Sequence, residues 1–229
     1  MKKIVLVGNP NVGKSVIFNS LTGKYVAVSN YPGTTVDIST GIDKFDRETF
    51  QVIDTPGVNS LIPHSEDEMV TSDILLDKGI KTVIQVADSK NLKRTLLLTV
   101  QLLETGLPLI LDLNMHDEAK DRGIAIDIKK LSQILGIEVV KTVAVTKEGV
   151  PQLRKTIWAT ISHKQPEFKL KYNSIIEEAI DKINGYLPTF LKNNRSVILR
   201  KSVKTHKIYS ATTEHSFENF ANPQNLYDL

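Results

Sequence analysis

The stretch "GNPNVGKS", Gly8 to Ser15, follows the apolar run "KIVLV" and precedes a segment with helical periodicity. It fits the pattern G-x-x-x-x-G-K-[ST], in which two glycines let a strand-to-helix turn curl so that its backbone N–H groups point inward. Such a turn holds phosphate oxygens, and the helix N-terminus adds positive potential. A glycine-rich turn that only resembles the pattern is the alternative, but the position after a strand favours a phosphate loop.

Length and composition limit the classes of protein to consider. The 229 residues can hold one full α/β domain and a small second unit. There is no cysteine, which excludes disulfides, thiolate zinc sites and thiol nucleophiles, and the five histidines are scattered. A net charge of +3 does not argue for nucleic acid, although "RKSVKTHK" at 200–207 is a basic run. The apolar runs are too short for a membrane span or signal peptide, so we expect a soluble, cytosolic chain.

Apolar periodicity predicts six strands that alternate with helices, which indicates an α/β fold with helices on both faces of a mostly parallel sheet. Only "DRE" separates the second and third strands, so these two should form a hairpin with one antiparallel strand. The predicted strands are at about 2–7, 37–45, 49–54, 82–87, 108–113 and 138–143, and the helices at about 14–22, 66–78, 91–105, 127–135 and 150–162.

The pattern changes after about residue 165, and we predict two units, a domain at 1–165 and a small helical appendage at 166–229. In "NSIIEEAIDKINGYL", a stripe of Ile175, Ile176, Ala179, Ile180 and Ile183 is typical of a helix. Beyond about residue 205 no clear period remains, so we expect that part to be loosely packed or only partly helical.

Residues that would hold a nucleotide's phosphates and Mg²⁺ occur in two elements. Lys14 would bridge the β- and γ-phosphates, and Ser15 would give its hydroxyl to Mg²⁺. In "IDTPG", at the end of the third strand, Asp54 would reach Mg²⁺ through water and Gly57 would place its N–H near the γ-phosphate. An ordinary turn is the alternative for "DTPG", but Asp54 belongs to the strand itself.

The loop "NYPGTTVD", Asn30 to Asp37, lies between these elements and ends in two threonines. A loop threonine that completes the Mg²⁺ shell only when a γ-phosphate is present would make the loop sensitive to the nucleotide. Thr35, directly before the next strand, suits this role better than Thr34.

A base site is predicted from "NMHD", which presents Asn114 and Asp117 at a strand-to-helix junction. The carboxylate can accept hydrogen bonds from N1–H and the 2-amino group of guanine, whereas adenine has neither donor there, so GTP is favoured over ATP. The alternative is that Asn114 only caps the following helix. In "TVAVTKEG", after the sixth strand, the Ala144 N–H is the best candidate to contact guanine O6.

The four motifs, Gly8–Ser15, Thr35, Asp54–Gly57 and Asn114–Asp117, resemble in their order the translation-factor-like class of Ras-like small GTPases over roughly residues 1–163. Within that class the chain resembles the N-terminal cytosolic domain of the ferrous-iron transport protein B (FeoB) family. The features that carry the resemblance are "GNPNVGKS", "NYPGTTVD", "DTPGVNSL", "SEDE" and "NMHDEA". Met115 stands where most GTPases carry lysine, and the stretch from "DTPG" to "SEDE" is unlike that of Ras-like or ribosome-assembly GTPases.

The resemblance implies a Ras-like P-loop GTPase that acts at the cytoplasmic side of the inner (plasma) membrane, as the switch of an iron-transporting membrane portion absent from this chain. The appendage would be the family's helical domain, which influences nucleotide release. In the base loop the family's usual "SA" appears as Val143-Ala144, which removes a serine hydroxyl. No nucleic-acid partner is expected, and the sequence leaves open whether the chain forms homo-oligomers. The residues expected to contact the guanine nucleotide are Gly8, Asn9, Asn11, Val12, Gly13, Lys14, Ser15, Val16, Thr34, Thr35, Asp54, Gly57, Asn114, Met115, Asp117, Val143 and Ala144.

Hydrolysis needs an aligned water and extra positive charge between the β- and γ-phosphates. Ras orients the water with a glutamine after the "DxxG" glycine, whereas this chain has Val58, and no arginine occurs from Lys24 to Asp37. Asn11 offers a side-chain carbonyl that can coordinate a monovalent cation, and the resemblance points to K⁺. We therefore expect Asn11, Lys14, Thr35 and Gly57 to support slow turnover, about 10⁻⁴ to 10⁻³ s⁻¹ unassisted, that K⁺ raises. A local hydrogen bond of Asn11 is the alternative.

Other interpretations stay open. Ser65 and Glu68 of "SEDE" have the spacing of a capping box, which we favour over a catalytic role, while Glu66 and Asp67 are candidates to orient water. Met115 would cover the base plane. For the whole chain, the alternatives are an Era-like ribosome-assembly GTPase, which would need an RNA-binding module after the GTPase domain, and a scaffold that binds GTP without hydrolysing it.

Overall fold

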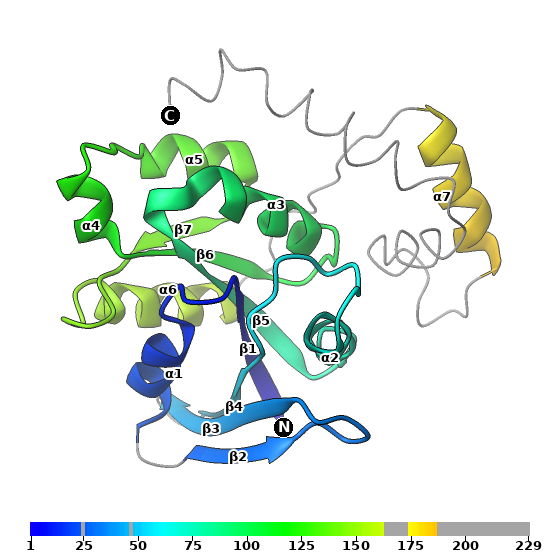
Figure 1. Ribbon diagram of the computed structural model, residues 1–229, viewed down its shortest axis with the longest axis horizontal. Coiled ribbons are helices and arrows are strands. Elements are labelled where there is room, and N and C mark those ends of the chain that lie inside the picture. Colours follow the sequence, from blue (N-terminus) through cyan, green and yellow to red (C-terminus); the bar gives the residue numbers. More distant parts are fainter. Residues whose placement is uncertain (24–25, 46–47, 163–173, 187–229) are drawn as a thin grey trace.

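A seven-stranded sheet forms the centre of the protein in the computed structural model, which describes residues 1–23, 26–45, 48–162 and 174–186 (Figure 1). The strand order is β2-β3-β4-β1-β5-β6-β7. The strands are β1 Lys2–Gly8, β2 Val26–Asn30, β3 Asp37–Phe45, β4 Glu48–Asp54, β5 Ile80–Asp88, β6 Leu109–Asn114 and β7 Glu138–Lys141. The helices are α1 Lys14–Thr22, α2 Glu66–Ile74, α3 Leu92–Leu103, α4 His116–Asp121, α5 Ile128–Leu135, α6 Val150–Ser162 and α7 Ser174–Tyr186, with a 3₁₀ turn, η1, at Ser89–Asn91.

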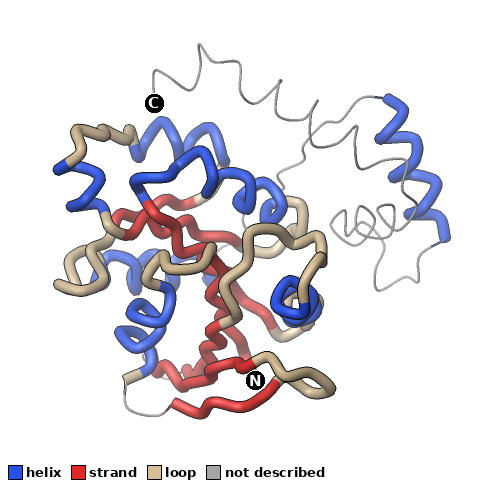
Figure 2. Tube along the Cα trace, viewed as in Figure 1, coloured by secondary structure: helices blue, strands red, loops and turns tan. Residues whose placement is uncertain are grey.

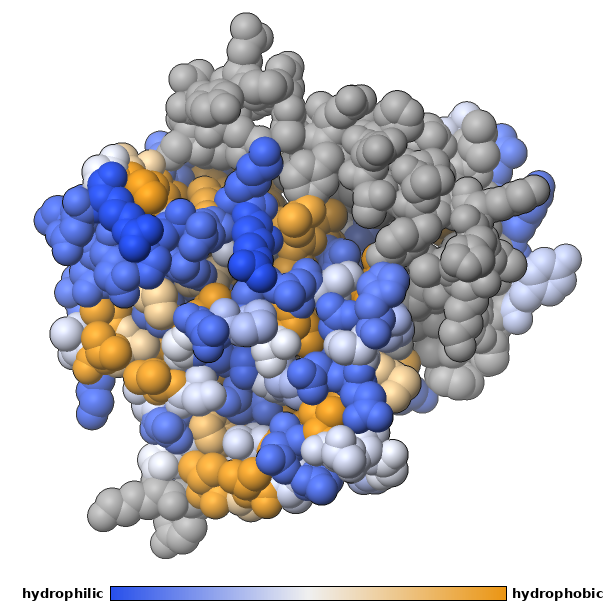
Figure 3. Space-filling view, in the orientation of Figure 1, coloured by the Kyte–Doolittle hydropathy of each residue, from blue (hydrophilic) through white to orange (hydrophobic). Residues whose placement is uncertain are grey.

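The predicted α/β fold is confirmed, but the predicted number of strands was wrong by one. The additional strand, β2, lies at the edge of the sheet and pairs antiparallel with β3. All five of its residues are exposed, the valines Val26 and Val28 among them. Figure 3 shows apolar surface at the bottom of the view, where Figure 1 places β2. Because nothing on β2 is buried, it lacks the apolar periodicity that identified the other strands. β3 runs against both β2 and β4, so it is the single reversed strand, as the hairpin argument required.

The two faces of the sheet carry separate apolar cores. Figure 2 shows the sheet with helices on both of its sides. Alternate residues of β1 point to opposite faces, so Val5 and Val7 belong to one core while Ile4 and Leu6 belong to the other. Helices α2, α3 and α5 cover the first face, and α1 and α6 cover the second.

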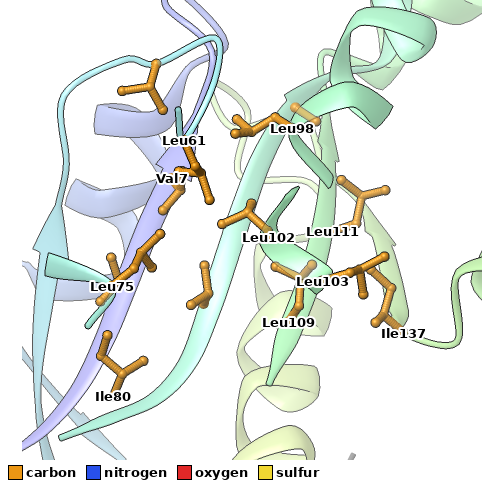
Figure 4. Packing of buried hydrophobic residues seen from close by; sticks show 14 of the residues in the cluster. Val7, Leu61, Leu75, Ile80, Leu98, Leu102, Leu103, Leu109, Leu111 and Ile137 are labelled. Atoms are coloured by element: carbon orange, nitrogen blue, oxygen red, sulfur yellow. The ribbon is translucent and has the colours of Figure 1, made fainter. Parts of the chain in front are cut away.

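Leucines of α3 fill the larger of these cores. Leu98 and Leu102 are at most 1% exposed, and Figure 4 shows them among the other buried residues of this core. Truncating such a buried leucine to alanine costs about 3 kcal/mol. This layer packs α3 against β5 and β6, two strands near the centre of the sheet.

On the sheet face covered by α1 and α6, Arg154 of α6 binds both α1 and β3. Its guanidinium donates to the backbone oxygens of Ser20 and Leu21 at the end of α1, at 3.2 and 2.6 Å, and pairs with Asp43 of β3 at 3.1 Å. A cation is favourable at a helix C-terminus, where carbonyl groups lack intrahelical partners. The last helix of the domain thus holds its first helix and its reversed strand.

Part of the predicted appendage is seen as α7, on which the Ile180 side chain is buried. The boundary at residue 165, the segment beyond residue 205 and the basic run at 200–207 lie outside the described residues, so the division into two units stays a prediction. No helix within the described ranges is long and apolar enough to cross a membrane.

Candidate nucleotide-binding site

The phosphate loop joins β1 to α1, and two of its positions admit only glycine. A Cβ on Gly8 would clash with the carbonyl oxygen of Val86 on β5. Gly13 has φ of 83°, and a Cβ there would clash with the Asn114 side chain. The first turn of α1 has neither a capping side chain nor an acidic residue. The N–H groups of Lys14 and Ser15 are therefore available to an anion, as the motif predicts, whereas that of Val16 donates to the Gly13 oxygen at 3.1 Å.

Lys14, Ser15 and Asp54 come together at the start of α1. Lys14 Nζ lies 2.5 Å from Asp54 Oδ1 and also donates to the Thr55 backbone oxygen. Ser15 Oγ donates to Asp54 Oδ2 at 2.8 Å. The Lys14 and Asp54 side chains are only 10% and 7% exposed. A hydroxyl beside a carboxylate is a suitable oxygen donor set for Mg²⁺, so these residues fit the predicted metal position.

The "DTPG" segment lies directly against the phosphate loop. A Cβ on Gly57 would stand 2.9 Å from Pro10 Cα, so glycine allows this close approach. The next N–H, that of Val58, donates to the Gly8 oxygen at 2.9 Å, and Asn9 Nδ2 donates to the Val58 oxygen at 3.2 Å. The segment is therefore part of the site and not an isolated turn.

Two residues that follow Gly57 have contrasting surroundings. The Val58 side chain is 1% exposed in the apolar core, so it cannot orient a water molecule. Asn59 Oδ1 accepts from Asn9 at 3.1 Å and from Arg94 of α3 at 2.8 Å. Asn9 therefore contacts the second motif through its side chain, a contact that motif spacing alone did not indicate.

The two threonines of the Asn30–Asp37 loop differ in their roles. Thr34 Oγ1 donates to the Tyr31 oxygen at 3.0 Å and accepts from the Val36 N–H at 3.3 Å, so it shapes the loop itself. Thr35 is exposed, and its hydroxyl donates to Glu66 of α2 at 3.2 Å. The Thr35 side chain thus makes no hydrogen bond within its own loop, and in this conformation it contacts α2.

Asn11 is an exposed residue of the phosphate loop. Its φ of 63° is in the left-handed region, which asparagine tolerates better than most residues. Its side chain makes no hydrogen bond within the described part of the chain. The alternative of a local hydrogen bond is therefore absent here, and the amide oxygen is available to a ligand.

Asn114 joins the base loop to the phosphate loop. Its Nδ2 donates to the Val12 oxygen at 2.9 Å, and its Oδ1 accepts the Ala144 N–H at 2.9 Å. The cap of α4 is instead Met115, with φ of 57° and no side-chain cap, so the capping alternative for Asn114 is wrong. Because the Ala144 N–H is already bonded to Asn114, its predicted contact with guanine O6 would have to share that hydrogen.

The remaining predicted contacts surround Asn114. Asp117 is exposed in the first turn of α4, and Met115 is half-buried with its Sδ 3.4 Å from Lys90 Nζ. Val12 of the phosphate loop and Val143 of the base loop are buried, whereas Val16 is 39% exposed on α1. The site residues of the four motifs thus lie at the end of the sheet where the parallel strands have their carboxyl termini.

Ser65 and Glu68 have the structural role that their spacing predicted. Ser65 is the N-cap of α2 and accepts the Glu68 N–H at 3.3 Å, while the Glu68 carboxylate accepts the His64 N–H at 2.9 Å. Ser65 thus caps the helix, while Glu68 reaches the N–H of the residue before the N-cap and not that of Ser65 itself, as a full capping box would have it. Glu66 contacts Thr35, as described above, so α2 reaches the Asn30–Asp37 loop.

A family model described as ferrous iron transport protein B matches residues 2–157. The chain belongs to this family. It is 42% identical over 180 residues to the Fe(2+) transporter FeoB of Staphylococcus aureus (strain MSSA476), a match that covers 79% of this chain and 27% of the relative. It is 38% identical to a Fe(2+) transport protein A/FeoB fusion protein of Porphyromonas gingivalis, over 81% of this chain and 23% of that protein. The chain thus spans about a quarter of the length of these relatives.

Solved structures of the family agree with this assignment. The cytosolic domain of the T. maritima FeoB iron transporter in a GDP form has a TM-score of 0.81 and 37% identity, covering 92% of this chain and 84% of that one. The same domain in a GMPPNP form has a TM-score of 0.79 and 38% identity, covering 87% and 80%. The Ras-like G-domain fold and its relation to the FeoB family are therefore shown.

Sequence reasoning missed two polar residues beneath the base loop, Asp112 and Thr142. Both are at most 1% exposed, and Thr142 Oγ1 lies 2.7 Å from Asp112 Oδ1. Burial raises the pKa of Asp112 to about 7, against a lowering by the Thr142 hydrogen bond. The one available signal was an acidic residue inside the apolar strand "LILDL".

Proposed function

We propose that this chain binds a guanine nucleotide with Mg²⁺ and hydrolyses GTP. The observation that carries the proposal is the pair of hydrogen bonds through which Asn114 joins the phosphate loop to the base loop. One ligand with phosphates at one end and a purine at the other would touch both loops. The GDP and GMPPNP forms of the related cytosolic domain support the same ligand class.

Guanine specificity is assigned to Asp117. Its side chain is exposed beside Asn114, so it has room to accept the N1–H and 2-amino hydrogens of guanine. An adenine base would leave the carboxylate without these donors, so the site should prefer guanine. Met115, one residue earlier, would cover the plane of the base.

Three residues would serve the metal and the transferred phosphoryl group. Ser15 would bind Mg²⁺ directly and Asp54 through water, while Thr35 would join only after its hydroxyl leaves Glu66. Bound Mg²⁺ would neutralise charge on the phosphates. Lys14 would exchange Asp54 for phosphate oxygens, and the Gly57 N–H would stand near the γ-phosphate.

Turnover without a partner is expected to be slow, because Val58 is buried and cannot hold the attacking water. The free amide oxygen of Asn11 supports a monovalent-cation site next to the phosphates. We propose K⁺ as that cation, and its charge would take the place of an arginine finger.

The biological role follows from the family. We propose that the chain is the cytosolic switch of a ferrous-iron transporter, with the transmembrane portion outside this chain. The family assignment does not support the Era-like alternative. A scaffold that binds but does not hydrolyse GTP is the competing hypothesis that experiment must address.

GTP hydrolysis with ATP as competitor, in matched KCl and NaCl, tests these assignments together. The proposal expects turnover that ATP does not inhibit and that KCl raises. Asn11→Ala should lose the KCl effect, while Asn91→Ala, on the η1 turn, should keep it. Equal stimulation in Asn11→Ala and the parent would exclude the cation site, and absent turnover in every salt would favour the scaffold.

A further inference from the structure

Asp112 is a buried carboxyl group that the functions above do not use. It lies on β6, where Val86 of β5 and Val140 of β7 are its partners on either side. On the same face, α6 contributes apolar residues such as Val150 and Leu153 to the core. Asp112 is 0% exposed, and its Oδ2 has no hydrogen-bond partner in the part of the chain that the structure describes.

A line of polar atoms runs from Asp112 to the base loop. Asp112 Oδ1 lies 2.7 Å from Thr142 Oγ1, which lies 3.3 Å from Asn114 Oδ1. The Asn114 amide then reaches Ala144 on one side and Val12 on the other. A threonine hydroxyl carries one hydrogen, so Thr142 cannot donate fully to both Asp112 and Asn114.

The protonation of Asp112 decides the direction of these hydrogen bonds. An ionised carboxylate at this position would be buried among apolar residues, which is strongly unfavourable. Burial, the main cause, raises the pKa of Asp112 to about 7. The neutral acid has its own O–H, and Thr142 Oγ1 is the acceptor within reach. Thr142 is then free to direct its hydrogen to Asn114 Oδ1.

We propose that Asp112 is a positioning residue of the nucleotide base site, whose carboxyl O–H donates to Thr142 so that the Thr142 hydroxyl fixes the orientation of the Asn114 amide. The reversed amide would aim Nδ2 at the Ala144 N–H and Oδ1 at the Val12 oxygen, opposing donor to donor and acceptor to acceptor. The hydrogen of Thr142 adds to the preference for the productive orientation. This inference rests on the proposed binding of guanine nucleotides.

Three variants of the whole chain separate positioning from simple packing. Asp112→Asn keeps a donor toward Thr142, Asp112→Leu removes it, and Thr142→Val removes the hydroxyl with little change of shape. We expect Asp112→Asn to bind GDP within about twofold of the parent. The other two should lose about tenfold in GDP affinity, the effect of one hydrogen bond, with ADP affinity unchanged.

The pH dependence of GDP affinity gives a second readout. As pH rises from 6 to 8, Asp112 ionises and draws the Thr142 hydrogen away from Asn114, so the parent should lose affinity relative to Asp112→Asn at the same pH. This comparison needs only the conservative variant and remains informative if Asp112→Leu does not fold.

The outcomes distinguish this inference from the proposed function. A parent that binds GDP and ADP equally would overturn the guanine assignment itself. A parent that prefers GDP, with Thr142→Val keeping the same preference, would overturn the positioning role alone. Parallel pH profiles for the parent and Asp112→Asn would also overturn it.

Discussion

The base side and the γ-phosphate side of the site differ in how firmly their side chains are held. On the base side, Asn114, Thr142 and Asp112 are at most 3% exposed and bonded in series. On the γ-phosphate side, Thr35 and Asn11 are exposed. Recognition can thus use groups already in place, whereas catalysis needs groups that change partners, Thr35 from Glu66 and Lys14 from Asp54.

The largest predicted effect concerns stability on the base side. Asp112 has a folded pKa of about 7, against an ordinary value of about 3.9 in the unfolded chain. Between these values the folded state binds more protons, so the free energy of unfolding should fall by about 4 kcal/mol as pH rises from about 4 to 8, and level off only above the folded pKa. Urea unfolding of the parent and Asp112→Asn measures this.

Asp112→Asn should show none of that fall, while the exposed Asp121→Asn should follow the parent. A parent whose pH profile matches that of Asp112→Asn would show that the carboxyl group titrates normally. It would also weaken the contrast between the buried Asp112, Thr142 and Asn114 of the base side and the exposed Thr35 and Asn11 of the γ-phosphate side.

Next in size is the loss of Lys14. Lys14→Met should weaken GDP binding about 100-fold, because charge-assisted hydrogen bonds to phosphate are lost and Asp54 keeps a buried charge without its partner. Titration calorimetry measures the affinity, with the exposed Lys44→Met on β3 as the matched control. An affinity loss of only a few-fold would mean that Lys14 keeps its Asp54 partner when nucleotide binds.

Asn114→Ala tests the base side directly. It leaves the Val12 oxygen and the Ala144 N–H without their partner, and the free energy of unfolding should fall by about 2 kcal/mol without any ligand. Thermal unfolding at pH 7 is the measurement, and Asn19→Ala, at an exposed position of α1, should change stability little. Unchanged stability would indicate that water replaces the amide, and the base side would then be less rigid than its burial implies.

The smallest effect is predicted for Thr35. Thr35→Ala should reduce GTP turnover about tenfold while leaving GDP affinity unchanged, because its hydroxyl serves only the triphosphate state. Glu66→Ala, which frees Thr35 from its present partner, should not reduce turnover through this route. An equal loss of GDP affinity in Thr35→Ala would contradict the assignment to the Mg²⁺ shell.

Elements with buried faces could be predicted from sequence, and elements without them could not. The strands at β1, β5 and β6 carry continuous apolar runs, and their predicted and observed bounds differ by at most two residues. β2 has no buried residue, and the six-residue α4 is shorter than two helical turns, so neither gave a periodic signal.

The site was predictable as a set of motifs but not as a network. Local spacing indicated the phosphate loop and the capping role of Ser65 and Glu68. The hydrogen bond from Asn114 to Val12 joins residues 102 positions apart. The hydrogen bond from Thr35 to Glu66 depends on where α2 packs. Such long-range contacts are set by the topology of the sheet, which sequence periodicity does not encode.

The hydrogen bonds of Arg154 to α1 and β3 have a consequence for the synthesis of the chain. During synthesis, α1 and β3 are complete more than 100 residues before the side chain that holds them, since Arg154 reaches back to Ser20, Leu21 and Asp43. A nascent chain that stops short of α6 would expose the apolar side of α1 and leave Asp43 without its Arg154 partner. Ribosome-bound intermediates of this domain should therefore resist proteolysis only once α6 has emerged.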